Sequence, residues 1–196
     1  MNFEFSEEQQ MLRDQARSYL TQHCPTTLVR RVLNNRETHD ADLYKGIAEM
    51  GWTATTIPEE YGGLGMSYLE LVVIAEELGR ACAPVPFSST VYLAAEAIMA
   101  FGTEAQKQAW LPKFADGTAI GCFAMGEAGG RVTPDQMSTR MQDGVLNGTK
   151  VPVADGGIAN VAIVVCASDK GEITVLFIEK KVKQCTRLNF AMWMII

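Results

Sequence analysis

Three short segments rich in glycine carry the residues of this sequence that could contact a ligand. The first, at 58–65, reads PEEYGGLG; the second, at 123–130, reads FAMGEAGG; the third, at 147–156, reads NGTKVPVADG. Glycine adopts backbone conformations closed to other residues, and a run of small residues leaves backbone amides free to approach a flat ligand or a phosphate. Each segment is therefore a candidate binding loop.

Each segment also has a purely structural interpretation. The segment at 58–65 can be a tight, partly buried loop between helices, and it lacks the spacing and the strand–helix frame of a dinucleotide-binding fingerprint. The segment at 123–130 can be a plain turn from a strand into a loop. The segment at 147–156 can be a strand with a bulge at Pro152 and a glycine turn, in which Lys150 alone indicates no chemistry.

Cysteine and histidine do not form a metal-binding pattern. No CxxC or HxxxH spacing occurs, and the two histidines, His23 and His39, lie far apart in the sequence. The cysteines are odd in number and scattered: Cys24, Cys82, Cys122, Cys166 and Cys185. This usage is typical of a reduced, cytoplasmic protein without a metal site.

Composition and charge exclude several classes of protein. The chain has 196 residues, of which 47% are hydrophobic and 20% charged, so collagen-like and broadly disordered classes are excluded. The formal net charge of −6, without a basic block, argues against nucleic acid as a partner. No apolar run approaches the roughly 20 residues that span a bilayer. The acidic start, MNFEFSEEQQ, is not a secretory signal, so we expect no membrane association.

The elements that must position these segments begin with helices, up to about Gly117. Capping boxes, in which Ser or Thr is followed three residues later by Gln or Glu, start helices at Ser6, Ser67 and Thr103. Apolar residues at helical spacing predict helices from Ser6 through Leu20, over 42–50, 68–78 and 88–101, and from Thr103 with a break or kink near Pro112.

Short runs rich in β-branched residues follow the helices. The predicted strands are 120–124, 137–142, 145–149, 161–167 and 173–179. Asp143-Gly144, between two of these runs, is a hairpin signal. Helices followed by strands predict an α+β fold, with an all-helical bundle at 1–117 and a small antiparallel β domain at 118–196.

Four pieces of the sequence, in register, resemble the flavin-dependent acyl-CoA dehydrogenase family. They are the YGGLG loop at 61–65, the EELGR helix end at 76–80, the GTEAQK helix start at 102–107 and the LNGTK run at 146–150. One such piece could arise by chance, whereas four at the family's spacing are hard to explain otherwise.

The resemblance extends from Phe3 to about Glu179 and implies both a fold and a chemistry. The family has an N-terminal helical domain, a middle β domain and a C-terminal four-helix domain. This chain resembles the first and most of the second, and we expect the C-terminal domain to be absent from it. In the family, FAD lies between the middle and C-terminal domains, against the acyl chain of a CoA thioester. A glutamate removes the α-proton, the β-hydrogen leaves as a hydride to the flavin, and electrons pass to an electron-transfer flavoprotein. A homo- or hetero-oligomer is also implied.

The resemblance carries the family's flavin-contacting residues onto two segments of this chain. The predicted cofactor-binding residues are Phe123, Met125, Gly126, Pro152, Val153 and Ala154. Gly126 stands where the family has Thr, Pro152-Val153-Ala154 stands where it has Trp-Ile-Thr, and Arg131 and Val132 fall where it has Gly-Ser-Asp. Backbone amides at Met125 and Gly126 are expected to reach the flavin's pyrimidine edge. Each missing side-chain hydrogen bond costs about 0.5–1.5 kcal/mol, so the resemblance implies weakened or retuned FAD retention.

The resemblance assigns no catalytic base within this chain. The family's base is expected beyond Ile196, and Glu127 occupies a motif position that indicates a structural role. The apolar, Met-rich end at 191–196 departs from the family's pattern and predicts a premature end, with exposed strand edges and self-association or poor solubility.

Three hypotheses from different classes follow. The chain is a truncated acyl-CoA dehydrogenase that is inactive alone; it is a non-catalytic partner subunit of a heteromeric acyl-CoA dehydrogenase, as the changes at 126, 132, 152 and 154 suggest; or it is a fragment without a function of its own. The sequence specifies neither the length nor the branching of the acyl group.

Overall fold

A computed structural model describes residues 5–130, 133, 135–168, 170 and 172–179. The described residues form two compact units. The first unit is drawn from Met1–Pro86 and Gln108–Thr118, and the second from Phe87–Lys107 and Ala119–Ile196. The division into a domain of 1–117 and a domain of 118–196 stays a prediction. Arg131, Val132, the strand-like run at 185–190 and the end at 191–196 lie outside the described residues.

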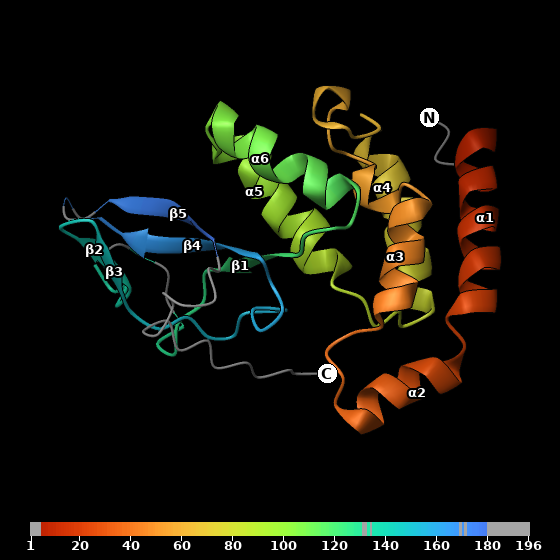
Figure 1. Ribbon diagram of the computed structural model, residues 1–196, viewed down its shortest axis with the longest axis horizontal. Helices are drawn as coiled ribbons and strands as arrows, with labels where there is room; N and C mark the ends of the chain where they lie inside the picture. Colours follow the sequence, from red (N-terminus) through yellow and green to blue (C-terminus); the bar gives the residue numbers. More distant parts are fainter. Residues whose placement is uncertain (1–4, 131–132, 134, 169, 171, 180–196) are drawn as a thin grey trace. The chain divides into compact units, whose positions relative to one another are not determined.

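The first unit is helical (Figure 1). Its helices are α1 (Glu7–His23), α2 (Thr26–Asn35), α3 (Ala41–Glu49), α4 (Tyr68–Arg80) and the end of α6 (Glu104–Ala115), with 3₁₀ turns at Trp52–Ala54 and Glu59–Tyr61. The three predicted capping boxes are confirmed. Gln9 N donates to Ser6 Oγ at 3.2 Å, Ser67 N donates to Glu70 Oε2 at 3.0 Å, and Gln106 N donates to Thr103 Oγ1 at 3.3 Å.

The core of the first unit lies between α1, α3, α4 and the end of α6. Large side chains with at most 2% exposure fill it: Leu20, Ile47, Trp52, Ile74, Leu111 and Phe114. Polar contacts at its edge fix α1 on α4, since Gln9 Nε2 donates to Glu70 Oε1 at 2.9 Å and Arg17 donates to Glu77 at 2.6 Å. The apolar stripes of these helices therefore set the architecture of this unit.

The glycine-rich segment at 58–65 is a tight loop, as its structural interpretation predicts. Gly63 N donates to Pro58 O at 3.1 Å, and Gly65 N donates to Ile57 O at 2.9 Å. A Cβ on Gly63 would lie 1.8 Å from the Ile57 carbonyl oxygen, so only glycine fits there. Backbone packing within the loop thus accounts for the glycine at 63 without a ligand.

Two features of the helical part differ from the sequence expectations. Of the break or kink predicted near Pro112, the break is wrong, because α6 continues to Ala115 and Asp116 N donates to Pro112 O at 3.0 Å; the kink stays a prediction. Helix α2 was not predicted. It begins after Pro25 without a side-chain cap, so the usual sequence signal for a helix start is missing.

The second unit joins a helical segment to a mixed sheet (Figure 1). A helix at 88–101 is confirmed, with a π-helical part at Ser88–Ala95, called η3, that continues into α5 (Glu96–Phe101). The strands are β1 (Gly121–Ala124), β2 (Arg140–Gln142), β3 (Val145–Asn147), β4 (Val161–Ala167) and β5 (Ile173–Glu179). The α+β class is therefore confirmed. No helix among the described residues combines the length and apolarity that a bilayer span requires.

Strand β4 is the centre of the sheet. Strand β5 pairs with it antiparallel over its whole length, from Val161 opposite Glu179 to Ala167 opposite Ile173. All seven residues of β4 are buried, which explains its unbroken apolar run. The predicted hairpin between β2 and β3 is confirmed, and Asp143 and Gly144 both have positive φ, as a type I′ turn requires.

The expectation of a wholly antiparallel sheet is wrong. Strand β1 pairs parallel with β4, with Gly121 opposite Val161, and β2 meets β4 in parallel at Arg140 opposite Ala167. Residues 125–160 connect β1 to β4, and a connection of that length permits the crossover that parallel strands need. The hairpin of β2 and β3 lies within this connection.

Candidate cofactor site

The two segments predicted to contact a cofactor lie side by side in the second unit. Strand β1 leads into Met125 and Gly126, and the 150–154 segment runs next to them. Val151 N donates to Gly126 O at 2.9 Å, and Lys150 Nζ donates to Met125 O at 3.1 Å. Backbone and side-chain hydrogen bonds therefore join the second glycine-rich segment to the third.

A buried ion pair closes this junction. Lys150 Nζ donates to Glu127 Oε1 at 2.8 Å, and the side chains of Lys150 and Glu127 are 1% and 6% exposed. Glu127 also accepts from Ser138 N at 2.7 Å, from Ser138 Oγ at 2.6 Å and from Thr139 N at 2.9 Å. One carboxylate thus connects the loop after β1, the segment before β2 and the lysine of the third segment.

Glu127 is held as a carboxylate. Burial alone would raise its pKa, but the hydrogen bonds from Lys150, Ser138 and Thr139 outweigh burial and hold the pKa far below its ordinary value. A carboxylate with four donors, one of them a buried ammonium group, has little tendency to accept a further proton. The geometry therefore supports the structural role predicted for Glu127 and argues against its use as a base.

Gly126 sits where no larger residue fits without movement. A Cβ there would lie 2.9 Å from the Val151 carbonyl oxygen. Since that oxygen belongs to the backbone, a side chain at 126 would have to push the two segments apart. Glycine at 126, where the sequence resemblance leads us to expect Thr, is therefore compatible with the close approach of Val151.

The six predicted cofactor-binding residues fall into three classes of exposure. Met125, Pro152 and Ala154 are exposed, Phe123 and Gly126 are half-buried, and Val153 is buried. Val153 packs in a core cluster with Cys122, Ala124, Ala159, Ala162 and Val164. The exposed residues present an apolar rim and backbone groups to which a flat ring could bind. Positions 126 and 154 supply no hydroxyl group. The residues present thus fit a flavin through backbone and apolar contacts.

Contacts to η3 hold both ends of the site. Gly121 N, at the start of β1, donates to Thr90 Oγ1 at 3.2 Å. Asp155, just after the third segment, accepts from Ser89 Oγ at 2.6 Å. Because both partners lie on η3, this helix positions β1 and the 150–154 segment together.

The pairing of Glu127 with Lys150 is the feature of this site that was not predicted. Taken one at a time in the sequence, Glu127 indicates a structural role and Lys150 indicates no chemistry. A signal was available, because opposite charges stood in two segments that the resemblance assigned to one cofactor. Among the described residues, no group of three His, Cys, Asp or Glu side chains is arranged to hold a metal ion.

Comparisons with known proteins agree with this architecture. The family model "Acyl-CoA dehydrogenase, N-terminal domain" matches residues 6–118. Acryloyl-CoA reductase (NADH) of Anaerotignum propionicum is 33% identical over 171 residues, which are 84% of this chain and 43% of that protein. A chain in the structure of the electron transferring flavoprotein of Acidaminococcus fermentans matches with a TM-score of 0.78 and 30% identity, over 92% of this chain and 50% of that one. Glutaryl-CoA dehydrogenase of Mycobacterium smegmatis, in complex with FADH2, matches with a TM-score of 0.77 and 27% identity, over 90% of this chain and 46% of that one.

These matches extend across both units of the structure. The chain spans about half the length of the relatives that it matches. The family model covers more than half of this chain, and the similarity to longer relatives continues through the sheet that carries the Glu127–Lys150 pair. By sequence and by fold, the chain belongs to the acyl-CoA dehydrogenase family.

Proposed function

We propose that this chain supplies the flavin-facing part of an FAD-dependent acyl-CoA dehydrogenase, which oxidises an acyl-CoA thioester between its α and β carbons. Membership of the family and the FADH2 complex of the glutaryl-CoA dehydrogenase support this proposal. The observation that carries it is the junction of Met125, Gly126 and Val151, because the buried Glu127–Lys150 pair keeps two exposed rims together.

The chain's own residues would bind and orient the ring. Backbone groups at Met125 and Gly126 and the apolar surfaces of Pro152 and Ala154 would hold it, while Val153 anchors the rim in the core. FAD, when bound, supplies the hydride acceptor. Apolar residues along the rim would exclude water from the ring.

We infer that the described part of this chain does not supply the base. Glu127 is the carboxylate bonded within the junction, and its four hydrogen bonds keep it ionised and fully engaged. Proton abstraction requires a base that can reach the substrate and accept a proton. The chain alone is therefore expected to bind FAD weakly and to leave an acyl-CoA unoxidised.

Titration of the purified chain with FAD tests this proposal. We expect the chain to quench flavin fluorescence in a saturable way. The Lys150→Met variant should lose this quenching, because its buried Glu127 carboxylate has no cation as a partner. Asp135→Asn, on an exposed residue, is the control and should bind as the unmodified chain does. No quenching, or equal quenching by Lys150→Met in a folded state, would overturn the assignment of this rim.

Activity needs a separate measurement. Reduction of a dye by butyryl-CoA in the presence of the chain and FAD is expected to stay at the level of the FAD blank. Turnover well above that blank would show that a base is present after all and would contradict the inactivity that we propose.

A non-catalytic partner subunit is the second candidate function. Gly126, Pro152 and Ala154 replace residues that supply a hydroxyl, an indole and a second hydroxyl in the family. These changes favour a chain that supports the cofactor of a sister subunit. Co-purification with a longer acyl-CoA dehydrogenase chain at a fixed ratio would support this function, and a chain that purifies without one would count against it.

The electron acceptor that we propose is an electron-transfer flavoprotein. The family resemblance implies it, and one matched chain comes from the structure of such a flavoprotein. Reduction of an added electron-transfer flavoprotein by the complete enzyme and an acyl-CoA tests this partner, and reduction of the dye alone would overturn it.

A further inference from the structure

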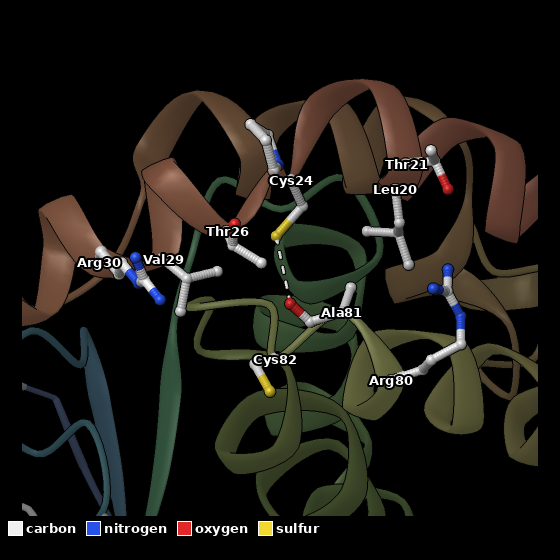
Figure 2. A pocket seen from close by; sticks show the side chains of 10 residues that line it. Leu20, Thr21, Cys24, Thr26, Val29, Arg30, Arg80, Ala81 and Cys82 are labelled. Carbon is white, nitrogen blue, oxygen red and sulfur yellow. Dashed lines mark hydrogen bonds between the residues drawn. The ribbon is translucent and has the colours of Figure 1, made fainter.

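The first unit has a pocket that the proposed function does not use. It has a volume of about 400 Å³ and is lined by residues from three places in the helical unit (Figure 2). These are the end of α1, the start of α2 and the residues that end and follow α4. The lining residues used below are Leu20, Cys24, Val29, Arg30, Arg80 and Cys82. The pocket is within the size range of small-molecule sites.

The pocket has more positive than negative charge. Arg30 makes no ion pair with any described residue, and the first turn of α2 contains no acid. Arg80 Nε donates to Glu77 Oε2 at 2.6 Å, but Glu77 is also the partner of Arg17, so two guanidinium groups share one carboxylate. The nearby Asp40 is already paired with Arg31. The pocket is therefore locally positive, although the chain as a whole has a net charge of −6.

The inner wall of the pocket is apolar and neutral. Leu20 is fully buried, and Val29, next to Arg30, is half-buried. The Cys24 thiol donates to the Ala81 carbonyl oxygen at 3.7 Å, and burial raises its pKa, so it stays protonated. Figure 2 shows Cys24 and Leu20 on the pocket wall, with Arg30 and Arg80 at opposite ends of it.

We propose that this pocket binds a small amphipathic anion, with a carboxylate or phosphate head at Arg30 and a short apolar body that runs along Val29 towards Cys24. Guanidinium groups bind both heads through paired N–H donors. The apolar wall selects against inorganic ions, which have no body to bury. This site belongs to the first unit and does not depend on the proposed function.

A titration followed by NMR of the full, ¹⁵N-labelled chain tests the site. Hexanoate and hexyl phosphate are the two probes, and uncharged hexanamide is the matched control for the apolar body. We expect both anions to change the amide chemical shifts of residues 20–30 and 80–82. The anion that binds with the higher affinity identifies the preferred head group. Equal shifts with hexanamide, or no shifts at these positions with either anion, would overturn the proposal.

Charge variants make the test specific. Arg30→Gln removes a cation without a partner and should weaken hexanoate binding about tenfold, the loss typical of one charge-assisted contact. Arg36→Gln removes an exposed cation from the residue that caps the end of α2, outside the pocket, and should change the affinity less than twofold. Equal losses in the two variants would mean that general charge, rather than this pocket, attracts the anion.

Cys82 provides a second readout at the pocket itself. It is exposed, whereas Cys24, Cys122 and Cys166 are buried. In a Cys185→Ser background, alkylation by neutral iodoacetamide should therefore report on Cys82. Saturating hexanoate should slow this reaction, and hexanamide should not. An unchanged rate in the presence of hexanoate would contradict occupation of the pocket.

Discussion

Glu77 and Glu127, one in each unit, are both buried, but they are neutralised in different ways. The partners of Glu77, Arg17 and Arg80, keep 50% and 43% of their side chains exposed. Glu127 faces Lys150, which is 1% exposed. Water and a second cation can compensate Glu77 when one arginine is lost, whereas Lys150 is the one cation that pairs with Glu127 among the residues that the structure describes. The junction at the candidate cofactor site therefore depends on one desolvated ion pair.

The largest expected effect comes from Lys150→Met. The variant leaves a buried carboxylate without its cation, which typically costs about 3–5 kcal/mol in the free energy of unfolding. Arg17→Met is the matched variant in the first unit, and it should cost clearly less because Arg80 still donates to Glu77. Urea denaturation of both variants measures the difference. A loss for Arg17→Met as large as that for Lys150→Met would remove the contrast between the two carboxylates.

The next largest effect is expected from Gly126→Thr, which restores the family's residue. Its Cβ would lie 2.9 Å from the Val151 carbonyl oxygen, so the junction must open, at a cost of about 1–3 kcal/mol. Gly129→Ala is the control, because a Cβ there meets no atom within 4 Å. Thermal unfolding of the two variants should separate them by several degrees. Equal melting temperatures would mean that the segments lie further apart than described.

Gly126 and Lys150 also show how much a single sequence can predict. The apolar run at 161–167 and the Asp143-Gly144 turn are local signals, and they predicted β4 and the hairpin correctly. The resemblance located Gly126 and Lys150 in cofactor-facing segments. Contact between the Lys150 ammonium and Glu127 depends on how residues 125–160 fold back, and a local pattern does not encode that path. The parallel pairing of β1 was missed for the same reason, and α2 was missed because Pro25 provides no side-chain cap.

Acid titration compares the two carboxylates without removing a cation. The pKa of Glu127 and that of Glu77 are both lowered in the folded chain, so each group stabilises the fold above the unfolded pKa of about 4.3, and that stabilisation is lost as pH falls towards the folded pKa. One such group contributes a slope of at most about 1.4 kcal/mol per pH unit.

Glu127→Gln removes one of these titrating groups. The free energy of unfolding, measured in urea between pH 5 and the acid limit of folding, should then fall less steeply with decreasing pH. Glu77→Gln is the matched variant in the first unit and should also flatten the curve. An unchanged slope in Glu127→Gln would mean that its carboxyl group has the same pKa in the folded and unfolded chains.

The smallest expected effect is on cofactor affinity, at the exposed residue Ala154. Ala154→Thr restores the hydroxyl that the family resemblance assigns to flavin binding, and one hydrogen bond contributes about 0.5–1.5 kcal/mol, so FAD affinity should rise about two- to tenfold. Ala154→Val has the same shape without the hydroxyl and separates hydrogen bonding from packing. Flavin fluorescence quenching measures both. Because Ala154 is exposed, the stability of either variant should match that of the unmodified chain. Equal gains in FAD affinity for the Thr and Val variants would show that the effect comes from apolar contact at the rim. No gain in either variant would show that the flavin does not contact residue 154.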